Sequence, residues 1–195
     1  VSCSWKLVAF LVFLVAFSLG PIIGAVFIHV PRYFPYDTSP EQVGFTRSDY
    51  QNVTLISKLK HSSLEPSLKI SGWYFPSIWE NNIEKQSSPL ANQSNSDATI
   101  IVVHGHGASM ARHQGSDISV LEKAVLPLWQ AGYNVLAIDL RNHGNSGYSG
   151  HVTLGFFESL DVIAALEYVQ TKTDSKRIGL WGESMGGATV LFTAA

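Results

Sequence analysis

The stretch "GLWGESMGGATVLFTAA", residues Gly179–Ala195, contains the pattern G-x-S-x-G between a short apolar run and a helix-like run. A serine on a sharp strand-to-helix turn has its hydroxyl lifted clear of the sheet, and the flanking positions must be small because they pack against the turn. The pattern predicts Ser184 as a candidate nucleophile, with Gly182 and Gly186 as the elbow glycines. The plainer interpretation, a glycine-rich turn with an idle serine, does not explain the strand and helix patterns on both sides.

The rest of the C-terminal region indicates a parallel sheet. Three continuous apolar runs, typical of strands buried on both faces, alternate with helical patterns. The strand candidates are "ATIIVVHG" (98–105), "YNVLAIDL" (133–140) and "RIGLWG" (177–182); the helix candidates are the Ile118, Leu121, Val125, Leu128 series, interrupted by Pro127, and the Phe156, Leu160, Ile163, Leu166, Val169 stripe. This order predicts βαβ units. Upstream, "VTLISKL" (53–59) and "LKISGWYF" (68–75) predict an antiparallel pair.

Each of the three apolar strands runs into a distinctive loop. These are "HGHG" (His104–Gly107), "DLRNHGNSG" (Asp139–Gly147) and "GESMGG" (Gly182–Gly187). Sites in open parallel sheets form at the carboxyl ends of the strands. Taken in order, the three loops resemble the oxyanion loop, the D-x-R-G-x-G-x-S loop and the nucleophile elbow of the α/β-hydrolase superfamily. The resemblance covers residues 53–195 and implies a truncated α/β-hydrolase fold with a mostly parallel sheet.

The resemblance also assigns roles to residues. It implies that Ser184 is the nucleophile and that the backbone N–H groups of Met185 and His106 form the oxyanion hole. His104 is expected to order its own loop, whereas the His106 side chain either lines the pocket or shapes the loop.

A local triad of Asp139, Arg141 and His143 is not expected. The family places its acid and its histidine after later strands, in the order Ser, Asp or Glu, His. We therefore expect this chain to be an N-terminal fragment that lacks both residues. Residues 32–195 alone are expected to aggregate and to show no serine-dependent esterase activity.

The N-terminal region predicts a membrane anchor. Leu7–Val30 is 24 residues long and has no Asp, Glu, Lys or Arg. A helix of that length is about 36 Å long, enough to span a hydrocarbon core of about 30 Å. We expect residues 1–31 to form a single-pass transmembrane anchor, followed by a linker over 32–52. A cleaved signal peptide and a buried core helix are the alternatives, and the side of the membrane that carries the domain stays open.

The composition narrows the choice of function. A net charge of −2 argues against nucleic-acid binding, and the single cysteine, Cys3, excludes an internal disulfide framework. No metal-ligand spacing or nucleotide fingerprint occurs, so we expect no metal and no cofactor. The leading hypothesis is a membrane-anchored serine hydrolase that cleaves a small ester, thioester or amide through an acyl-enzyme. The alternatives are a non-catalytic hydrolase-fold binding or scaffold module tethered to the membrane, and acyl transfer by the same residues.

Overall fold

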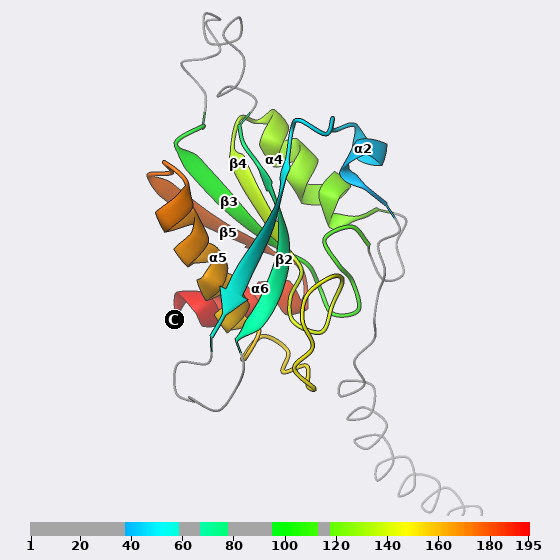
Figure 1. The fold of residues 1–195 in the computed structure, drawn as a ribbon, viewed down its shortest axis with the longest axis vertical. Helices are drawn as coiled ribbons and strands as arrows, with labels where there is room; N and C mark the ends of the chain where they lie inside the picture. The colour runs from blue at the N-terminus through cyan, green and yellow to red at the C-terminus, as the bar shows by residue number, and fades with distance from the viewer. Residues whose placement is uncertain (1–37, 59–66, 78–94, 113–117) are drawn as a thin grey trace, which may run out of the picture.

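The computed structural model describes residues 38–58, 67–77, 95–112 and 118–195, and its centre is a mixed five-stranded sheet in the order β1-β2-β4-β3-β5 (Figure 1). The strands are β1 (Gln51–Ser57), β2 (Leu68–Phe75), β3 (Ala98–Val103), β4 (Asn134–Ile138) and β5 (Arg177–Gly182). The expected combination of an antiparallel pair and parallel strands is present, but the sheet is mixed rather than mostly parallel, because β2 pairs antiparallel with β4 as well as with β1.

Strand pairing follows the apolar runs. The expected antiparallel pair is confirmed, with Val53 opposite Gly72 and Leu55 opposite Ile70. β3 pairs in parallel with β4 on one side and with β5 on the other. All three strands are apolar along most of their length, because layers of side chains cover both faces of the sheet. The parallel register aligns the carboxyl ends of β3, β4 and β5 at one edge.

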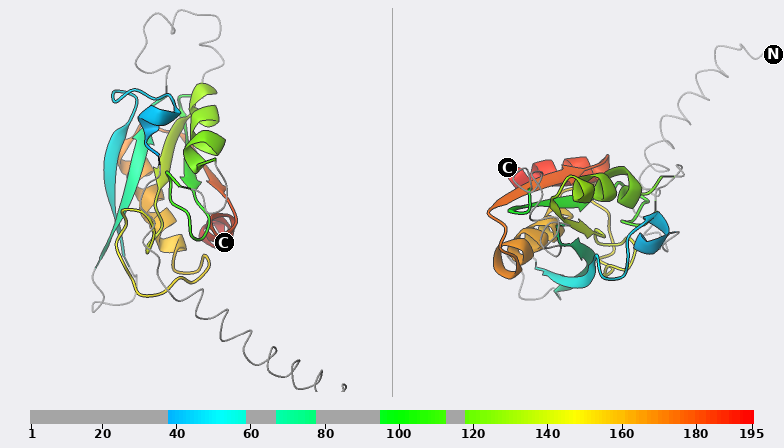
Figure 2. Two further views of the ribbon diagram at one scale, coloured as in Figure 1. Left: turned by 90° about the vertical axis from the view of Figure 1, so that its right-hand side faces the viewer. Right: turned by 90° about the horizontal axis from the view of Figure 1, so that it is seen from above.

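The helices cover both faces of the sheet. The π-helical turn η2 (Leu121–Val125) continues into α4 (Leu126–Gln130), and α5 (Ser159–Lys172) lies on the opposite side of the sheet (Figures 1 and 2). Helix α6 (Met185–Ala194) contacts β5, β3 and α5. Pro127 stands in the first turn of α4, directly after the π turn, so the interruption expected there takes the form of a change in helix type.

The apolar stripe expected for the helix over 156–169 is partly wrong. Phe156 precedes α5 and is 60% exposed, while the fully buried positions of α5 include Val162, Ala165 and Val169. The buried face also holds the carboxylate of Asp161. The helix therefore presents a mixed polar and apolar face to the sheet, and the apolar positions alone do not reveal its orientation.

Part of the expected linker packs against the sheet. Within residues 38–52, α2 (Pro40–Val43) forms a short helix, and Phe45 and Tyr50 are buried against Phe75. The ordering of this segment follows from the apolar area that these two aromatic rings bury. The predicted anchor, Leu7–Val30, lies outside the described residues; within the described ranges, no helix combines the length and the apolar character needed to cross a membrane.

Candidate active site

Ser184 occupies the turn between β5 and α6. Its backbone has φ 51° and ψ −116°, which is a rare conformation for a residue other than glycine. The side chain is exposed, and it lies directly before the first residue of α6. Backbone strain of this kind costs about 1–3 kcal/mol and persists only where the surrounding structure fixes it.

The two elbow glycines show what fixes the turn. A Cβ atom on Gly186 would lie 2.4 Å from the carbonyl oxygen of Val103, and one on Gly182 would lie 2.3 Å from the carbonyl oxygen of Gly186. Either contact is far shorter than a real Cβ tolerates. The G-x-S-x-G spacing thus lets the start of α6 pack directly on the backbone of β3 and β5, with Ser184 at the top of the turn.

The loop after β3 lies beside Ser184. A Cβ atom on Gly105 would stand 3.3 Å from the Cβ and 3.9 Å from the Oγ of Ser184. Gly105 is followed by His106, which is half-buried. The structure therefore brings together the elbow and the loop that we expected to contribute the second oxyanion donor.

A buried histidine sets the orientation of this loop. The ring of His104 donates from Nδ1 to the carbonyl oxygen of Gly105 at 2.7 Å, and its Nε2 accepts from the N–H of Leu140 at 3.0 Å. The described chain contains no cis peptide bond, so the Gly105 carbonyl and the His106 N–H point in opposite directions from one peptide plane. Fixing the Gly105 oxygen therefore fixes the direction of the His106 N–H.

His143 makes the corresponding contacts from the loop after β4. Its Nδ1 donates to the carbonyl oxygen of Arg141 at 2.8 Å, and its Nε2 accepts from the N–H of Gly107 at 3.2 Å. The His143 ring lies 5.1 Å from the His104 ring and 5.7 Å, edge to face, from the His106 ring. His104 of the loop after β3 thus bonds to the loop after β4, and His143 of the loop after β4 bonds to the loop after β3.

Both histidines are neutral at physiological pH. Burial is the main cause that lowers the pKa of His104 and of His143 to about 4, from an ordinary value of 6.5. In each neutral ring one nitrogen donates to a backbone carbonyl and the other accepts from a backbone N–H, so neither is available to take a proton from Ser184. These contacts match the structural role expected for His104 and argue against a local triad through His143.

Asp139 braces the same loop from within. Its carboxylate accepts from the backbone N–H groups of Met110 and Asn145, at 2.8 and 2.9 Å. Gly144 has φ 51°, and a Cβ there would overlap the Asp139 carboxylate at 2.0 Å. Asp139 is therefore committed to holding two loop segments together.

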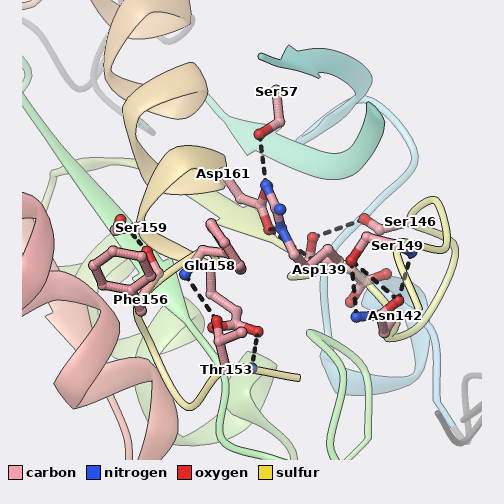
Figure 3. Close-up of polar contacts among 12 residues, drawn as sticks. Ser57, Asp139, Asn142, Ser146, Ser149, Thr153, Phe156, Glu158, Ser159 and Asp161 are labelled. Carbon is pink, nitrogen blue, oxygen red and sulfur yellow. Dashed lines mark hydrogen bonds and ion pairs between the residues drawn. The ribbon is translucent and has the colours of Figure 1, made fainter. Parts of the chain in front are cut away.

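Arg141 connects this loop to α5 and β1. It forms an ion pair with Asp161 at 2.7 Å and donates to the hydroxyl of Ser57 at 3.0 Å. In Figure 3 the side chains of Asp161, from α5, and of Ser57, from β1, point toward one another; both contact the Arg141 guanidinium. Burial raises the pKa of the Asp161 carboxyl, and the hydrogen bonds from Arg141 oppose that effect. The sequence places Glu158 and Asp161 on a solvated or loop-facing side; both face loops, and neither is solvated.

Glu158 shapes the loop that precedes α5. Its carboxylate accepts from the N–H and hydroxyl of Thr153 and from the N–H of Gly155, at 2.6–2.8 Å (Figure 3). Leu154 and Gly155 have φ values of 53° and 118°, and Gly155 packs closely on Thr189 of α6. Sequence reasoning missed this anchor; the available signal is a pair of acidic residues within an otherwise apolar helix pattern.

Among the described residues, no group of three or more His, Cys, Asp or Glu side chains could hold a metal ion.

Comparison with known proteins identifies a family and several relatives. Residues 94–195 match the Hydrolase_4 family, described as serine aminopeptidase, S33. The chain is 27% identical over 191 residues to the protein YfhR of Escherichia coli K12. The aligned region covers 94% of this chain and 54% of YfhR. It is 26% identical over 174 residues to the probable dipeptidyl-aminopeptidase B of Paracoccidioides brasiliensis, covering 84% of this chain and 18% of that protein.

A solved structure shows the same fold. The esterase Pf2001 of Pyrococcus furiosus superposes with a TM-score of 0.59 at 28% identity, over 85% of this chain and 52% of the esterase. The chain thus spans about half the length of YfhR and of this esterase. The family match includes the elbow, the loop after β3 and the loop after β4. The chain belongs to the serine aminopeptidase S33 family of the α/β-hydrolase superfamily.

Proposed function

We propose that the protein is a serine hydrolase that cleaves a small ester, thioester or amide through an acyl-enzyme on Ser184. The observation that carries the proposal is the strained, exposed Ser184 at the start of α6, with Gly105 packed against it. The superfamily match and the similarity to an esterase support the same reaction class.

The chemistry follows from this placement. The Ser184 Oγ attacks the substrate carbonyl carbon while a general base takes the hydroxyl proton. The carbonyl oxygen becomes an oxyanion, for which the N–H groups of Met185 and His106 are the proposed donors. Each such donor is worth about 3 kcal/mol in the transition state. The base returns the proton to the leaving group, and water then releases the acyl group by the same steps in reverse.

The base is a histidine other than His104 and His143, since both of these rings are already committed to backbone partners. In the order of the superfamily, the acid and the histidine follow the nucleophile along the chain. We therefore place both after Ser184 in the whole protein.

The proposal includes a membrane tether through residues 1–31. Its support is the uncharged apolar run Leu7–Val30. The intact protein is expected to stay in the membrane fraction after a carbonate wash, and release by carbonate alone would contradict a spanning helix.

The serine assignment is tested in the intact protein with a fluorophosphonate probe and a short p-nitrophenyl ester. Ser184→Ala should abolish labelling and lower kcat by about 10⁴-fold or more, because no acyl-enzyme can form. Ser48→Ala, a change of the same size at another exposed serine, is the control and should retain both. Circular dichroism should show that both variants remain folded.

The possible results separate the hypotheses. Wild-type turnover in folded Ser184→Ala would show that Ser184 is not the nucleophile. A folded wild-type protein that neither labels nor hydrolyses any acyl substrate would favour the binding or scaffold module instead.

A further inference from the structure

The two peptide planes that flank His106 are each held by a histidine ring. The plane between Gly105 and His106 is held by His104, through the Gly105 carbonyl. The plane between His106 and Gly107 is held by His143, whose Nε2 accepts from the Gly107 N–H at 3.2 Å. The role of His104 fits a histidine that orders its own loop. His143 comes from a different loop and has no role in the mechanism proposed above.

The turn in question is one that can change conformation locally. Ala108 N–H donates to the Gly105 carbonyl at 3.3 Å, which closes a four-residue turn with His106 and Gly107 at its centre. Gly107 has φ 73°, the value expected at the third position of a type II turn. Rotation of the central peptide converts a type II turn into a type I turn, and it changes ψ of His106 and φ of Gly107. The Gly107 N–H belongs to that central peptide.

The His143 ring is itself well fixed. It is 2% exposed, its Nδ1 donates to the Arg141 carbonyl, and its faces and edges contact His104 and His106. Arg141 is in turn held by Asp161 through both its side chain and its backbone N–H. A continuous set of contacts therefore runs from α5 through Arg141 and His143 to Gly107.

We propose that His143 is a positioning residue for catalysis, which keeps the central peptide of the 105–108 turn from rotating and so steadies the turn in which His104 aims the neighbouring His106 N–H at the oxyanion. This inference rests on the proposed serine hydrolase function. His143 does not touch the reacting atoms; it acts by preventing rotation of the peptide next to the donor.

Two substitutions at His143 separate its two hydrogen bonds. Gln is long enough to place an acceptor oxygen where Nε2 stands, so His143→Gln can keep the bond from Gly107. Asn reaches only as far as Nδ1, so His143→Asn can keep the bond to Arg141 but loses the one from Gly107. His151→Asn repeats the same chemical change at an exposed histidine and is the control.

The measurements are made on the intact protein. They are kcat and KM for a p-nitrophenyl ester, the rate of fluorophosphonate labelling, and hydrogen exchange of the Gly107 amide. His143→Asn should lower kcat and the labelling rate by about 10- to 100-fold, part of the full effect of an oxyanion donor, with KM within about threefold. Exchange at Gly107 should become faster. His143→Gln should recover most of the lost kcat, and the slow exchange with it.

The results that would overturn the inference are distinct from failure of the proposed function. If the wild type labels at Ser184 and folded His143→Asn keeps its kcat, His143 does not position the turn. Faster Gly107 exchange with unchanged kcat in either variant would also overturn the inference. If His143→Asn does not fold, His143→Gln decides, since kcat and Gly107 protection must be retained or lost together. A wild type that does not label at Ser184 would overturn the proposed function and the catalytic role of His143 with it.

Discussion

The turns after β4 and after β5 are immobilised in different ways. The turn after β4 is held by side chains: Asp139 accepts two backbone N–H groups, Arg141 pairs with Asp161, and His143 reaches to Gly107. The turn after β5 is held by close backbone packing at Gly182 and Gly186. Both turns follow strands that pair in parallel with β3, one on either side; β4 is buried, whereas β5 is only partly buried.

Under the proposed function, the difference reflects which side chains of each turn must stay accessible to a substrate. Ser184 is exposed, and a side chain used to brace its own turn would not be available to a substrate. The elbow is held by the packing of its glycines, so the Ser184 hydroxyl is not needed to hold the turn in its strained conformation. The turn after β4 can use its side chains as braces, because none of them has to face a substrate. The two turns should therefore fail in different ways when they are altered.

The largest effect is expected from adding a methyl group at the elbow. Gly186→Ala places a Cβ 2.4 Å from the Val103 carbonyl oxygen and 2.6 Å from that of His104, and the backbone of β3 cannot move away without losing its pairing. We expect a loss of about 3–5 kcal/mol in the free energy of unfolding of the intact protein, measured by urea titration. Gly187→Ala is the matched control, because its Cβ would meet the Gly182 carbonyl oxygen at 3.3 Å and helix propensity favours alanine. Equal midpoints for the two variants would contradict close packing as the cause.

The next prediction concerns the loss of the buried ion pair between Arg141 and Asp161. Arg141→Met leaves the Asp161 carboxylate buried without its cation, and breaking a buried pair in this way costs about 3–5 kcal/mol. Arg177→Met removes an ion pair of similar length, 2.6 Å, whose side chains are 61% and 43% exposed, and it should not change the urea midpoint measurably. Similar shifts in both variants would show that the buried network after β4 is not what stabilises this turn.

A smaller effect is expected from pH. The pKa of His143 and that of His104 are lowered to about 4, while the unfolded chain titrates near 6.5. Between these values the unfolded state binds protons that the native state does not, so the free energy of unfolding falls as pH falls. Each histidine should account for a loss of about 2 kcal/mol between pH 7 and pH 5. His143→Gln should flatten this dependence by about one proton in urea titrations over that range, and an unchanged slope would contradict a buried neutral His143.

The elbow could be predicted from sequence because its pattern is local. Gly182, Ser184 and Gly186 lie within five residues, so the pattern can be seen in one short stretch of sequence, and the close contact of Gly182 with the Gly186 carbonyl is itself local. The contact of Gly186 with Val103 is not local, and only the structure shows it. The strands were predictable for a similar reason: β3, β4 and β5 are continuous apolar runs because both of their faces are covered. The location of the His106 loop beside the elbow could be predicted because this loop directly follows the apolar run of β3.

The braces of the turn after β4 could not be predicted in the same way. The contact between His143 and Gly107 joins residues 36 positions apart. The sequence around either residue gives no indication that the other is its partner. The burial of Asp161 depends on Arg141, 20 positions away, so the helix pattern around Asp161 left a solvated and a loop-facing position equally open. Phe156 was assigned to the buried stripe by spacing alone, although the loop held by Glu158 turns it away from the core.

The packing of Gly186 on the end of β3 has a consequence for the order of events during synthesis of the chain. The Val103 and His104 carbonyls that meet the elbow leave the ribosome long before β5 does, and the turn at Ser184 has nothing to fold against until β5 has paired with β3. Until then Ser184 is free to adopt an ordinary, unstrained backbone conformation. The strained conformation of Ser184 therefore depends on pairing between two strands that are far apart in the chain, and it forms only after β5 has joined β3.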